Sequence, residues 1–280
     1  MKQINEYINE IICGDNVEVL REFPDECIDL TVTSPPYDNL RTYNGFDWDF
    51  EALAKELYRV TKRGGVVVWV VNDATIDGCE TLTSFKQALY FKEIGFNVET
   101  MIWRKTNPVP QFPSIPRYTH DFEYMFILSK GKIGTFNPIM VTTKTAGRKI
   151  NRNHVNAFSM QSADRPRDEV TIVKAEKRLT NTWELSNASG EVKGHPAVFP
   201  EKLAEMHIIS WSNPGDIVLD PFVGSGTTAK MAALNDRKYI GIDISEEYCE
   251  LARKRVAEAT YKEKGGDQHD YQGSHLEIVD

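Results

Sequence analysis

Short apolar runs alternate with longer amphipathic segments along most of this chain. The run 66–71, Val-Val-Val-Trp-Val-Val, is typical of a strand buried on both faces of a sheet. In the segment 50–61, Leu53, Leu57 and Val60 recur at helical spacing and predict an amphipathic helix. This alternation predicts an α/β fold with a doubly wound, mainly parallel sheet covered on both faces. We expect further strands at 8–12, 28–33, 97–103, 122–128, 216–219 and 239–243, and further helices at 16–22, 82–94, 201–211, 229–234 and 246–261.

Breaks in this pattern divide the chain into parts. Lys62-Arg63-Gly64-Gly65 is expected to close the helix 50–61, because cations followed by glycine typically end a helix. From Phe136 to Ser189 the alternation disappears, and Trp183 is expected to return the chain to the core. We therefore expect one half of the main domain at 1–134, an insert at 135–190, the second half of the same domain at 191–261, and a disordered tail at 262–280.

A glycine-rich turn follows the strand predicted at 216–219. Its sequence is Asp220-Pro221-Phe222-Val223-Gly224-Ser225-Gly226-Thr227, and a helix and the strand 239–243 come next. Glycines allow the backbone of such a turn to approach a ligand closely. Asp243 stands at the tip of the second strand, where a carboxylate can accept hydrogen bonds from both hydroxyls of a ribose. The unit is therefore predicted to bind a nucleoside.

The turn differs from the common phosphate-binding loops. Ala229 stands where a third glycine of Gly-x-Gly-x-x-Gly would fall, and the lysine of a P-loop is missing. Asp220 would repel a pyrophosphate, whereas an acid at this position suits a cationic or amine-bearing ligand. S-adenosyl-L-methionine carries both a sulfonium and an α-amino group. An ordinary nucleotide-binding crossover is the alternative interpretation.

The strand 28–33 leads directly into a second motif, Ser34-Pro35-Pro36-Tyr37. The two prolines stiffen the backbone and remove two N–H groups, which leaves carbonyl groups free to accept hydrogen bonds. A serine oxygen and a neighbouring carbonyl can both accept from one amino group, and a tyrosine ring can stack on a base. Two acceptors that draw an exocyclic amine toward tetrahedral geometry favour the transition state of its methylation. Taken alone, the tetrapeptide favours a simple turn over such a site.

Together the two motifs resemble those of DNA amino-methyltransferases, which methylate the exocyclic amines of adenine or cytosine. The resemblance runs through most of the chain and implies a Rossmann-like methyltransferase fold, S-adenosyl-L-methionine as the cofactor, and duplex DNA from which the target base is flipped. The tetrapeptide precedes the expected insert and the glycine-rich turn comes last, which is the permuted order of the family's β group. Residues 135–190 would then be the target-recognition region.

The resemblance also implies roles for single residues. Ser34, Pro35, Pro36 and Tyr37 would be catalytic. For Asp15, which follows the first predicted strand, a helix N-cap is a strong competing interpretation. The segment 194–203 resembles the family's helix-leading cofactor segment and contributes Phe199. The expected cofactor-binding residues are Asp15, Thr33, Phe199, Asp220, Pro221, Phe222, Gly224, Ser225, Gly226, Thr227 and Asp243.

Charge is distributed unevenly along the chain. The formal net charge is −8, yet residues 101–190 carry 14 lysine or arginine residues against 7 acidic ones. A concentrated basic region favours association with phosphates more than the total charge opposes it. A solvated basic loop is the alternative interpretation of this region. The proline-rich stretch 105–117 resembles a loop that family members often have at the mouth of the base pocket, and a rigid surface connector is the alternative there. The expected DNA-binding residues are Arg117, Lys144, Arg148, Lys149, Arg152, Arg165 and Arg167.

Composition excludes several other classes of protein. No apolar run has the length of a membrane span, and the N-terminus does not have the pattern of a signal peptide. The four cysteines, Cys13, Cys27, Cys79 and Cys249, are scattered without metal-ligand spacing, so we expect no metal site and a cytoplasmic location. A cognate restriction endonuclease and a homodimer partner are candidate partners besides DNA.

The target base and two other functions remain open at this point. Ser34 and the segment 195–200 resemble cytosine-N4 enzymes more than adenine-N6 enzymes, which usually have Asp or Asn at the first tetrapeptide position. Methylation of RNA or of a protein glutamine is less compatible with the motif order. A catalytically silent DNA-binding specificity subunit is the alternative from another class, and the intact motifs at 34–37 and 220–228 argue against it.

Overall fold

The computed structural model describes residues 3–36, 48–110, 116–151, 170–187 and 199–265. These residues belong to two compact units, one within 1–137 and 181–269 and the other within 138–180. The predicted boundary of the insert, 135–190, therefore encloses the second unit but also takes in a strand of the first. The tail was expected to begin at residue 262, but the last helix continues to Gly265.

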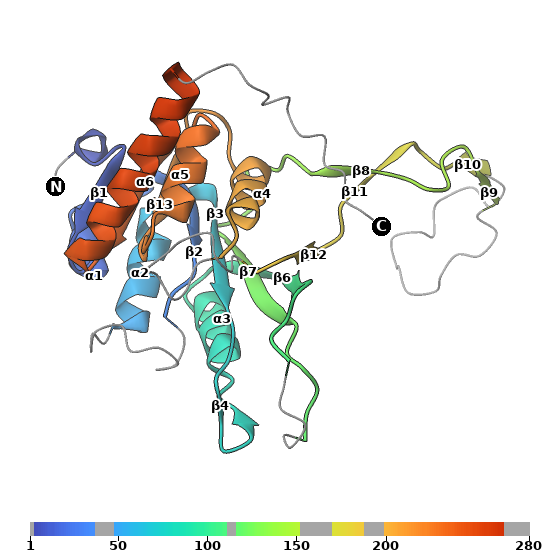
Figure 1. Cartoon of the computed structure of the whole chain (residues 1–280), viewed down its shortest axis with the longest axis horizontal. Coiled ribbons are helices and arrows are strands. Elements are labelled where there is room, and N and C mark those ends of the chain that lie inside the picture. Colours follow the sequence, from blue (N-terminus) through green and yellow to red (C-terminus); the bar gives the residue numbers. More distant parts are fainter. Residues whose placement is uncertain (1–2, 37–47, 111–115, 152–169, 188–198, 266–280) are drawn as a thin grey trace. The chain divides into compact units, whose positions relative to one another are not determined.

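The first unit is built on an eight-stranded sheet of order β1-β14-β13-β2-β3-β7-β6-β12 (Figure 1). Every neighbouring pair is parallel except those that β7 makes with β3 and β6, so a single strand runs against the others. The predicted α/β class and mainly parallel sheet are confirmed. In this order, the strands are β1 (Glu10–Cys13), β14 (Lys238–Asp243), β13 (Ile217–Asp220), β2 (Ile28–Thr33), β3 (Thr61–Val71), β7 (Phe122–Ser129), β6 (Asn97–Lys105) and β12 (Thr182–Leu185).

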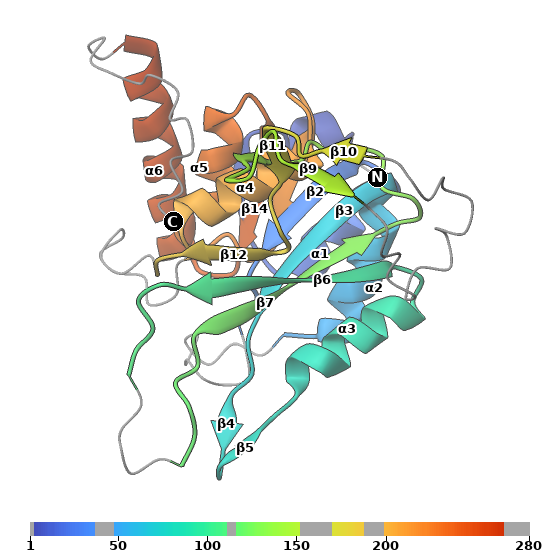
Figure 2. The ribbon, with the colours of Figure 1, turned by 90° about the vertical axis from the view of Figure 1, so that its right-hand side faces the viewer.

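Helices cover both faces of this sheet (Figures 1 and 2). One layer contains α1 (Asn16–Arg21), α2 (Phe50–Val60) and α3 (Thr83–Glu93), and the other contains α4 (Glu201–Trp211), α5 (Thr227–Leu234) and α6 (Glu246–Gly265). A short 3-10 turn, η1 (Ile4–Glu6), precedes β1, and a small hairpin of β4 (Thr75–Ile76) and β5 (Cys79–Glu80) follows β3. The chain thus winds along both sides of the sheet, as a doubly wound fold requires.

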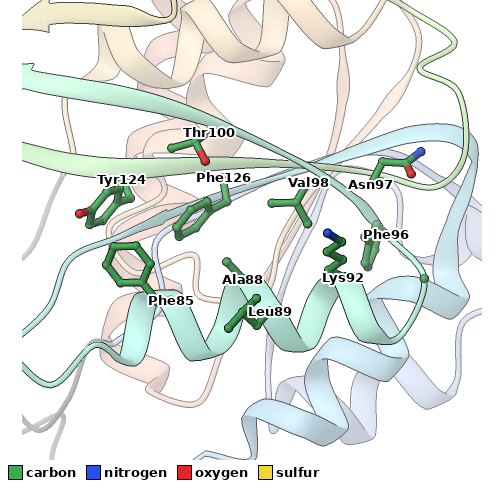
Figure 3. Close-up of a pocket in the computed structure, with 11 residues that line it drawn as sticks. Phe85, Ala88, Leu89, Lys92, Phe96, Asn97, Val98, Thr100, Tyr124 and Phe126 are labelled. Atoms are coloured by element: carbon green, nitrogen blue, oxygen red, sulfur yellow. The ribbon is translucent and has the colours of Figure 1, made fainter.

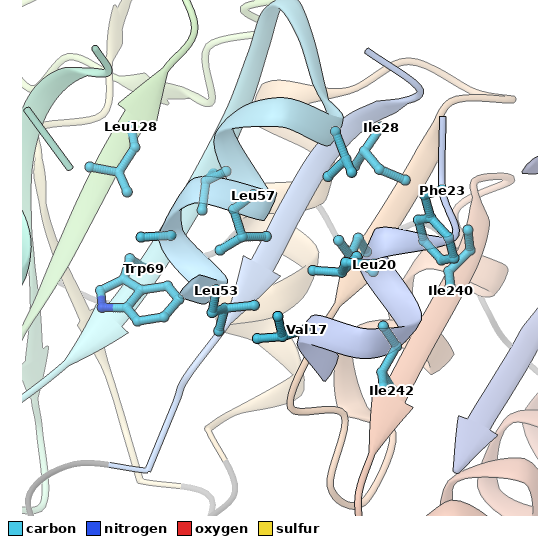
Figure 4. Close-up of a cluster of buried hydrophobic side chains, with 14 of the residues drawn as sticks. Val17, Leu20, Phe23, Ile28, Leu53, Leu57, Trp69, Leu128, Ile240 and Ile242 are labelled. Carbon is cyan, nitrogen blue, oxygen red and sulfur yellow. The ribbon is translucent and has the colours of Figure 1, made fainter. Parts of the chain in front are cut away.

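Large apolar side chains fill the space between the sheet and the layer α1–α3 (Figure 4). Leu20, Phe23, Leu57 and Trp69 are fully buried there. The single polar atom of the Trp69 side chain, Nε1, donates to Gln87 at 2.9 Å, so its burial leaves no unpaired N–H group. A second cluster joins the opposite side of the sheet to α5 and α6 through Ile11, Val223, Ala229, Cys249, Ala252 and Val256.

Helix α2 ends one residue before its expected end, but the role expected for residues 62–65 is wrong. The helix stops at Val60, Thr61 Oγ1 donates to the Leu57 carbonyl at 2.6 Å, and Lys62 to Gly65 already belong to β3. Gly64 and Gly65 are therefore part of a strand and do not end the helix. Gly64 has a φ of +83°, and a Cβ atom there would lie 3.1 Å from the backbone nitrogen of Gly134. A close backbone contact therefore explains this glycine.

The second unit consists of short antiparallel pairs. Strand β8 (Met140–Thr142) pairs with β11 (Glu176–Arg178), and β9 (Lys149–Asn151) pairs with β10 (Val170–Ile172). Trp183, by contrast, lies in β12 of the first unit and is 5% exposed, so its predicted return to the core is confirmed. Within the described ranges, no helix combines the length and apolar character needed to cross a bilayer.

A groove of about 710 Å³ lies between α3 and the strands β6 and β7 (Figure 3). Phe85 and Leu89 line it from the helix and are 42% and 68% exposed, while Tyr124 and Phe126 line it from the sheet. None of the residues predicted to be catalytic, cofactor-binding or DNA-binding lines this groove. It is a feature of the helical layer and not of the candidate site.

Candidate functional site

The glycine-rich turn joins β13 to α5, as the sequence predicts. Gly226 forms the N-cap of α5 with a φ of +84°, a conformation that favours glycine. A Cβ atom on Gly226 would lie only 2.8 Å from the Ala252 Cβ of α6, so the turn is packed tightly against that helix. Helix α6 therefore supports the turn from Asp220 to Thr227 on one side. The backbone on the other side of the turn can face a ligand at the edge of the sheet.

Asp220 connects the turn to the second predicted motif. Its side chain is 2% exposed, and its Oδ1 accepts hydrogen bonds from Thr33 Oγ1 at 2.7 Å and from the Phe222 N–H at 3.1 Å. Thr33 ends β2 and directly precedes Ser34. Strands β2 and β13 are neighbours in the sheet, and Thr228 Oγ1 adds a hydrogen bond to the Val32 carbonyl at 3.1 Å. Two motifs that are far apart in sequence thus meet at the carboxyl ends of adjacent strands.

Burial changes the proton affinity of Asp220. Removal of the carboxylate from water raises its pKa to about 6, and the hydrogen bonds from Thr33 and the Phe222 backbone oppose this rise only in part. An acid with this pKa is ionised at neutral pH at a cost to the fold. A cationic ligand group beside it would stabilise the ionised form, which fits the amine-bearing ligand expected from the sequence.

Asp243 ends β14, which lies next to β13 in the sheet. Its Oδ2 accepts from the Gly224 N–H at 3.0 Å and its Oδ1 from the Ser245 N–H at 2.9 Å. Burial raises the pKa of this carboxyl as well. Because each carboxylate oxygen has two lone pairs, each retains one for a further donor. The geometry leaves Asp243 able to accept from two ribose hydroxyls while it fixes the turn.

Two other predicted cofactor residues stand before helices, Asp15 before α1 and Phe199 before α4. Asp15 is exposed and accepts from the Glu18 N–H at 3.0 Å as the N-cap of α1, so the competing structural interpretation applies to it. This cap uses one of its oxygens, and a cofactor role stays a prediction. Gly14 donates its N–H to the Asp243 carbonyl at 2.9 Å, which keeps the two strand ends together. Phe199 is half-buried directly before Pro200 and α4.

The described part of the motif predicted to be catalytic ends at Pro36. Ser34 is half-buried, Pro35 is buried and Pro36 is half-buried, while Tyr37 lies outside the described residues. Trp48 packs edge-on against Phe222 of the turn, with ring centroids 5.0 Å apart. Sequence reasoning did not single out Trp48, although its place after the tetrapeptide and before the start of α2 was a signal for it.

Ser225 and Thr227 turn their hydroxyl groups toward α6. Arg255 Nη1 donates to Ser225 Oγ at 2.9 Å, to the Ser225 carbonyl at 2.6 Å and to Thr227 Oγ1 at 3.4 Å. Their predicted roles toward a cofactor therefore concern their backbone atoms, and those roles stay predictions. Arg255 and its partner Glu201 were missed, because α6 carries several similar cations and only the fold distinguishes them.

The predicted DNA-binding residues are distributed over both units. Lys144, Arg148 and Lys149 are exposed in the second unit, and Arg117 is exposed in the β6–β7 connection of the first. Arg152, Arg165 and Arg167 lie outside the described residues. The four described cations have the exposure that phosphate contacts require.

Metal-binding chemistry finds no support among the residues that the structure describes. No group of three or more His, Cys, Asp or Glu side chains within them could hold an ion. All four cysteines are free thiols. Burial raises the pKa of Cys27 to about 11 and that of Cys249 to about 12, which disfavours their nucleophilic thiolate forms.

Comparisons with known proteins show the family of this chain. Residues 28–254 match the N6/N4 methyltransferase family model, described as DNA methylase. The chain is 53% identical over 241 residues to the orphan methyltransferase M.BamHII of Bacillus amyloliquefaciens, covering 82% of this chain and 88% of the relative. It is 29% identical to the DNA adenine methyltransferase YhdJ of Escherichia coli K12, covering 90% of this chain and 83% of the relative.

A solved structure shows the same architecture. The putative DNA modification methylase TTHA0409 of Thermus thermophilus, in complex with S-adenosyl-L-methionine, superposes with a TM-score of 0.60 at 26% identity and covers 89% of this chain and 95% of that one. The likeness in fold and family confirms the Rossmann-like methyltransferase architecture expected from the two motifs.

Proposed function

Because this chain belongs to the N6/N4 family of DNA amino-methyltransferases and uses S-adenosyl-L-methionine, we propose that it transfers a methyl group to the N4 amine of cytosine in duplex DNA. The observation that carries the proposal is the hydrogen bond between Thr33 and Asp220. Thr33 directly precedes the tetrapeptide that would hold an amine, and Asp220 begins the turn that would hold the methyl donor. On this proposal, one edge of the sheet would hold both halves of a transfer site.

The residues at this edge fit the cofactor. Asp243 has acceptors for ribose hydroxyls, Asp220 is a buried acid that an amino group would stabilise, and Gly226 admits no side chain. When bound, S-adenosyl-L-methionine supplies an electrophilic methyl group on a positively charged sulfur. We propose that Thr33, beside Asp220, keeps the end of β2 in register with this region.

The tetrapeptide would activate the amine. Ser34 Oγ and the Pro35 carbonyl would each accept one N–H of the exocyclic amino group, and Tyr37 would stack on the ring of the flipped base. These acceptors favour a tetrahedral nitrogen, whose lone pair has left conjugation with the ring and can bond to the methyl carbon. As this bond forms, the bond between the methyl carbon and the sulfur of the donor would break and leave a neutral thioether, and the nitrogen would release its extra proton to water to give the neutral methylamine. No metal and no covalent enzyme intermediate are needed.

The choice of cytosine rests on the motif itself. Serine at position 34 and the segment 195–200 resemble those of cytosine-N4 enzymes. The relative YhdJ is named a DNA adenine methyltransferase, and this keeps adenine N6 as the second candidate. Both bases present an amine to the same pair of acceptors, so the mechanism above serves either one.

Expression in a host without DNA methylation would distinguish the two bases. Single-molecule sequencing of the host genome reports which base is modified and in which sequence. We expect N4-methylcytosine within one short motif. N6-methyladenine would overturn the choice of base and leave the family assignment intact.

Replacing Asp243 by alanine should weaken cofactor binding by about 1.5–3 kcal/mol, because a charged acceptor for the ribose is lost. Isothermal titration with S-adenosyl-L-methionine measures this directly. Glu247→Ala is the matched control, since Glu247 is an exposed acid at the start of α6. Wild-type affinity in Asp243→Ala would show that the ribose is held elsewhere.

Replacing Lys144, Arg148 and Lys149 together by alanine should weaken binding to any duplex and reduce its salt dependence. Each phosphate contact contributes about 0.9 to the slope of log affinity against log salt concentration. Fluorescence anisotropy with a labelled duplex over a salt series gives both quantities. Unchanged affinity and slope would identify these side chains as a solvated basic loop.

The control for this experiment removes the same charge from helices of the first unit. The variant Lys55→Ala, Lys86→Ala and Lys254→Ala replaces three exposed lysines of α2, α3 and α6. Its salt slope should stay at the wild-type value. Equal losses in both variants would show that total charge, and not the second unit, controls binding.

Two further partners are proposed, a cognate restriction endonuclease and a second copy of this chain. The relatives include an orphan methyltransferase and type II methyltransferases such as M.HinfI of Haemophilus influenzae, so both an independent enzyme and one with a cognate restriction endonuclease are candidates for this chain. A homodimer would double the mass of the 31.9 kDa chain in light scattering.

A further inference from the structure

Arg255 lies beneath the glycine-rich turn and contacts three separate segments of the first unit. Its side chain is 14% exposed. Nη1 donates to the carbonyl and the hydroxyl of Ser225, at 2.6 and 2.9 Å, and Nη2 donates to Glu201 Oε1 at 2.7 Å. Glu201 in turn accepts from Lys230 Nζ at 2.7 and 2.8 Å. One guanidinium therefore connects α6 to the turn, to the start of α4 and, through Glu201, to α5.

The places of these contacts relate them to the cofactor. Ser225 lies between Gly224, whose N–H is bound by Asp243, and Gly226, whose positive φ begins α5. Glu201 is the first residue of α4 and follows Phe199 and Pro200, the segment expected to reach the cofactor. Arg255 thus holds the two cofactor-facing segments, the turn and the start of α4, through a single side chain.

The packing of α6 reinforces this contact. Ala252 and Arg255 are three residues apart and so lie on the same face of the helix. Ala252 is the residue that a Cβ atom on Gly226 would strike, at 2.8 Å. The helix therefore supports the turn at Gly226 by shape and at Ser225 by hydrogen bonds. Glu201 forms ion pairs with both Arg255 and Lys230, so one partly buried carboxylate is shared by two cations.

We propose that Arg255 is a positioning residue for S-adenosyl-L-methionine: it fixes the orientation of the Ser225 carbonyl and couples the turn to the start of α4, without touching the reacting atoms. The proposal rests on cofactor binding at the turn. Loss of the guanidinium should allow the turn and α4 to move independently, so cofactor affinity falls. Asp220 holds Thr33, the residue before the tetrapeptide, and within the described residues the hydrogen bonds of Arg255 go to Ser225, Thr227 and Glu201 and not to the end of β2, so the methyl-transfer step at saturating cofactor should change little.

Arg255→Met and Arg255→Lys test the proposal. Arg255→Met keeps much of the length of the side chain and removes all its hydrogen bonds, and we expect its Kd for S-adenosyl-L-methionine to rise about tenfold or more. The KM for the cofactor should rise with it, while kcat on saturating plasmid DNA stays within about threefold of wild type. Arg255→Lys should recover part of the affinity, because one ammonium cannot reproduce the planar fork that serves both Ser225 and Glu201.

A double variant tests the coupling through Glu201. Glu201→Gln removes the charge that joins Arg255 to Lys230, and it should weaken cofactor binding by itself. If the residues act as a unit, Arg255→Met combined with Glu201→Gln should bind no more weakly than Arg255→Met. Additive losses would show that the two residues act separately and would overturn the coupling.

Two controls separate positioning from general destabilisation. Lys254→Met removes an exposed cation, 73% exposed, from the adjacent position of α6 and should leave the Kd unchanged. Val60→Ala removes methyl groups from a fully buried site in the core at α2 and should lower Tm without changing the Kd. A weakened cofactor affinity in Val60→Ala, equal to that of Arg255→Met at an equal loss of Tm, would overturn the proposal.

The remaining outcomes are also decisive. Wild-type affinity in both Arg255 variants would show that Arg255 only stabilises the fold. If circular dichroism shows that Arg255→Met does not fold, the Kd of Arg255→Lys decides: an increase supports the proposal and wild-type affinity overturns it. A fall in kcat with an unchanged Kd would place Arg255 in the chemical step and contradict it. Failure of the wild-type protein to bind S-adenosyl-L-methionine would instead refute the proposed function.

Discussion

Replacing Ser34 by alanine should slow methyl transfer roughly 10- to 100-fold while leaving the affinities for DNA and cofactor nearly unchanged. Ser34 directly follows Thr33, which Asp220 holds at the edge of the sheet, so its backbone lies next to the start of the turn proposed to bind the cofactor. A hydrogen bond to the amine gains most as the nitrogen becomes tetrahedral and its N–H groups more acidic. The lost acceptor therefore affects the transition state more than the bound ground state.

Single-turnover assays with saturating cofactor and duplex DNA isolate this step. Ser34→Asp restores an oxygen acceptor and should recover part of the rate that Ser34→Ala loses. Tyr37→Ala should lose a stacking contact of about 1–3 kcal/mol and much of the turnover, with little change in cofactor affinity. Full activity in both alanine variants would show that the tetrapeptide is only a turn.

Replacing Asp220 by asparagine should stabilise the fold at neutral pH and weaken cofactor binding at the same time. The folded-state pKa of Asp220 is raised to about 6 from an ordinary value of 3.8, so the folded state retains a proton that the unfolded state loses. This acid consequently removes stability as pH rises from about 4 to about 6, and the loss persists above that window. Asparagine abolishes the loss and keeps one oxygen acceptor for Thr33 and the Phe222 N–H.

The expected gain is about 1–3 kcal/mol in the free energy of unfolding at pH 7.5, with a flatter pH dependence between pH 4 and 6. Urea unfolding at several pH values measures both. Isothermal titration should show a Kd for S-adenosyl-L-methionine raised about tenfold or more, because the charged partner for an amine-bearing ligand is gone. A less stable variant, or one with wild-type cofactor affinity, would contradict these expectations.

Much of the fold could be predicted because strands and helices have different periods. The run at 66–71 identified the central strand, and the spacing of Leu53, Leu57 and Val60 identified α2, although the residues 62–65 expected to close that helix belong to β3. The signal of cations and glycine at 62–65 was misleading, since Gly64 is needed where the backbone passes Gly134. Nothing in the local sequence reports such a contact between distant segments.

Those residues of the candidate site that stand at strand ends could be predicted from the sequence. Asp220 and Asp243 follow apolar runs, and parallel strands bring their carboxyl ends to one edge, so their proximity followed from the topology. The directions of the side chains within the turn did not follow from the topology. Ser225 turns its hydroxyl toward Arg255, which lies 30 positions later on a helix with several cations. Only the packing of Ala252 against Gly226 places that arginine under the turn.

Product analysis with the purified protein is the most direct test of methyl transfer to an exocyclic amine. Unmethylated plasmid is incubated with the protein and S-adenosyl-L-methionine carrying a deuterated methyl group, and the DNA is digested to nucleosides for tandem mass spectrometry. We expect the labelled methyl group on the N4 nitrogen of cytosine, and a much slower appearance of the same product with Ser34→Ala. A labelled methyl group on carbon 5 of cytosine, or no labelled nucleoside at all, would contradict the function proposed for this chain.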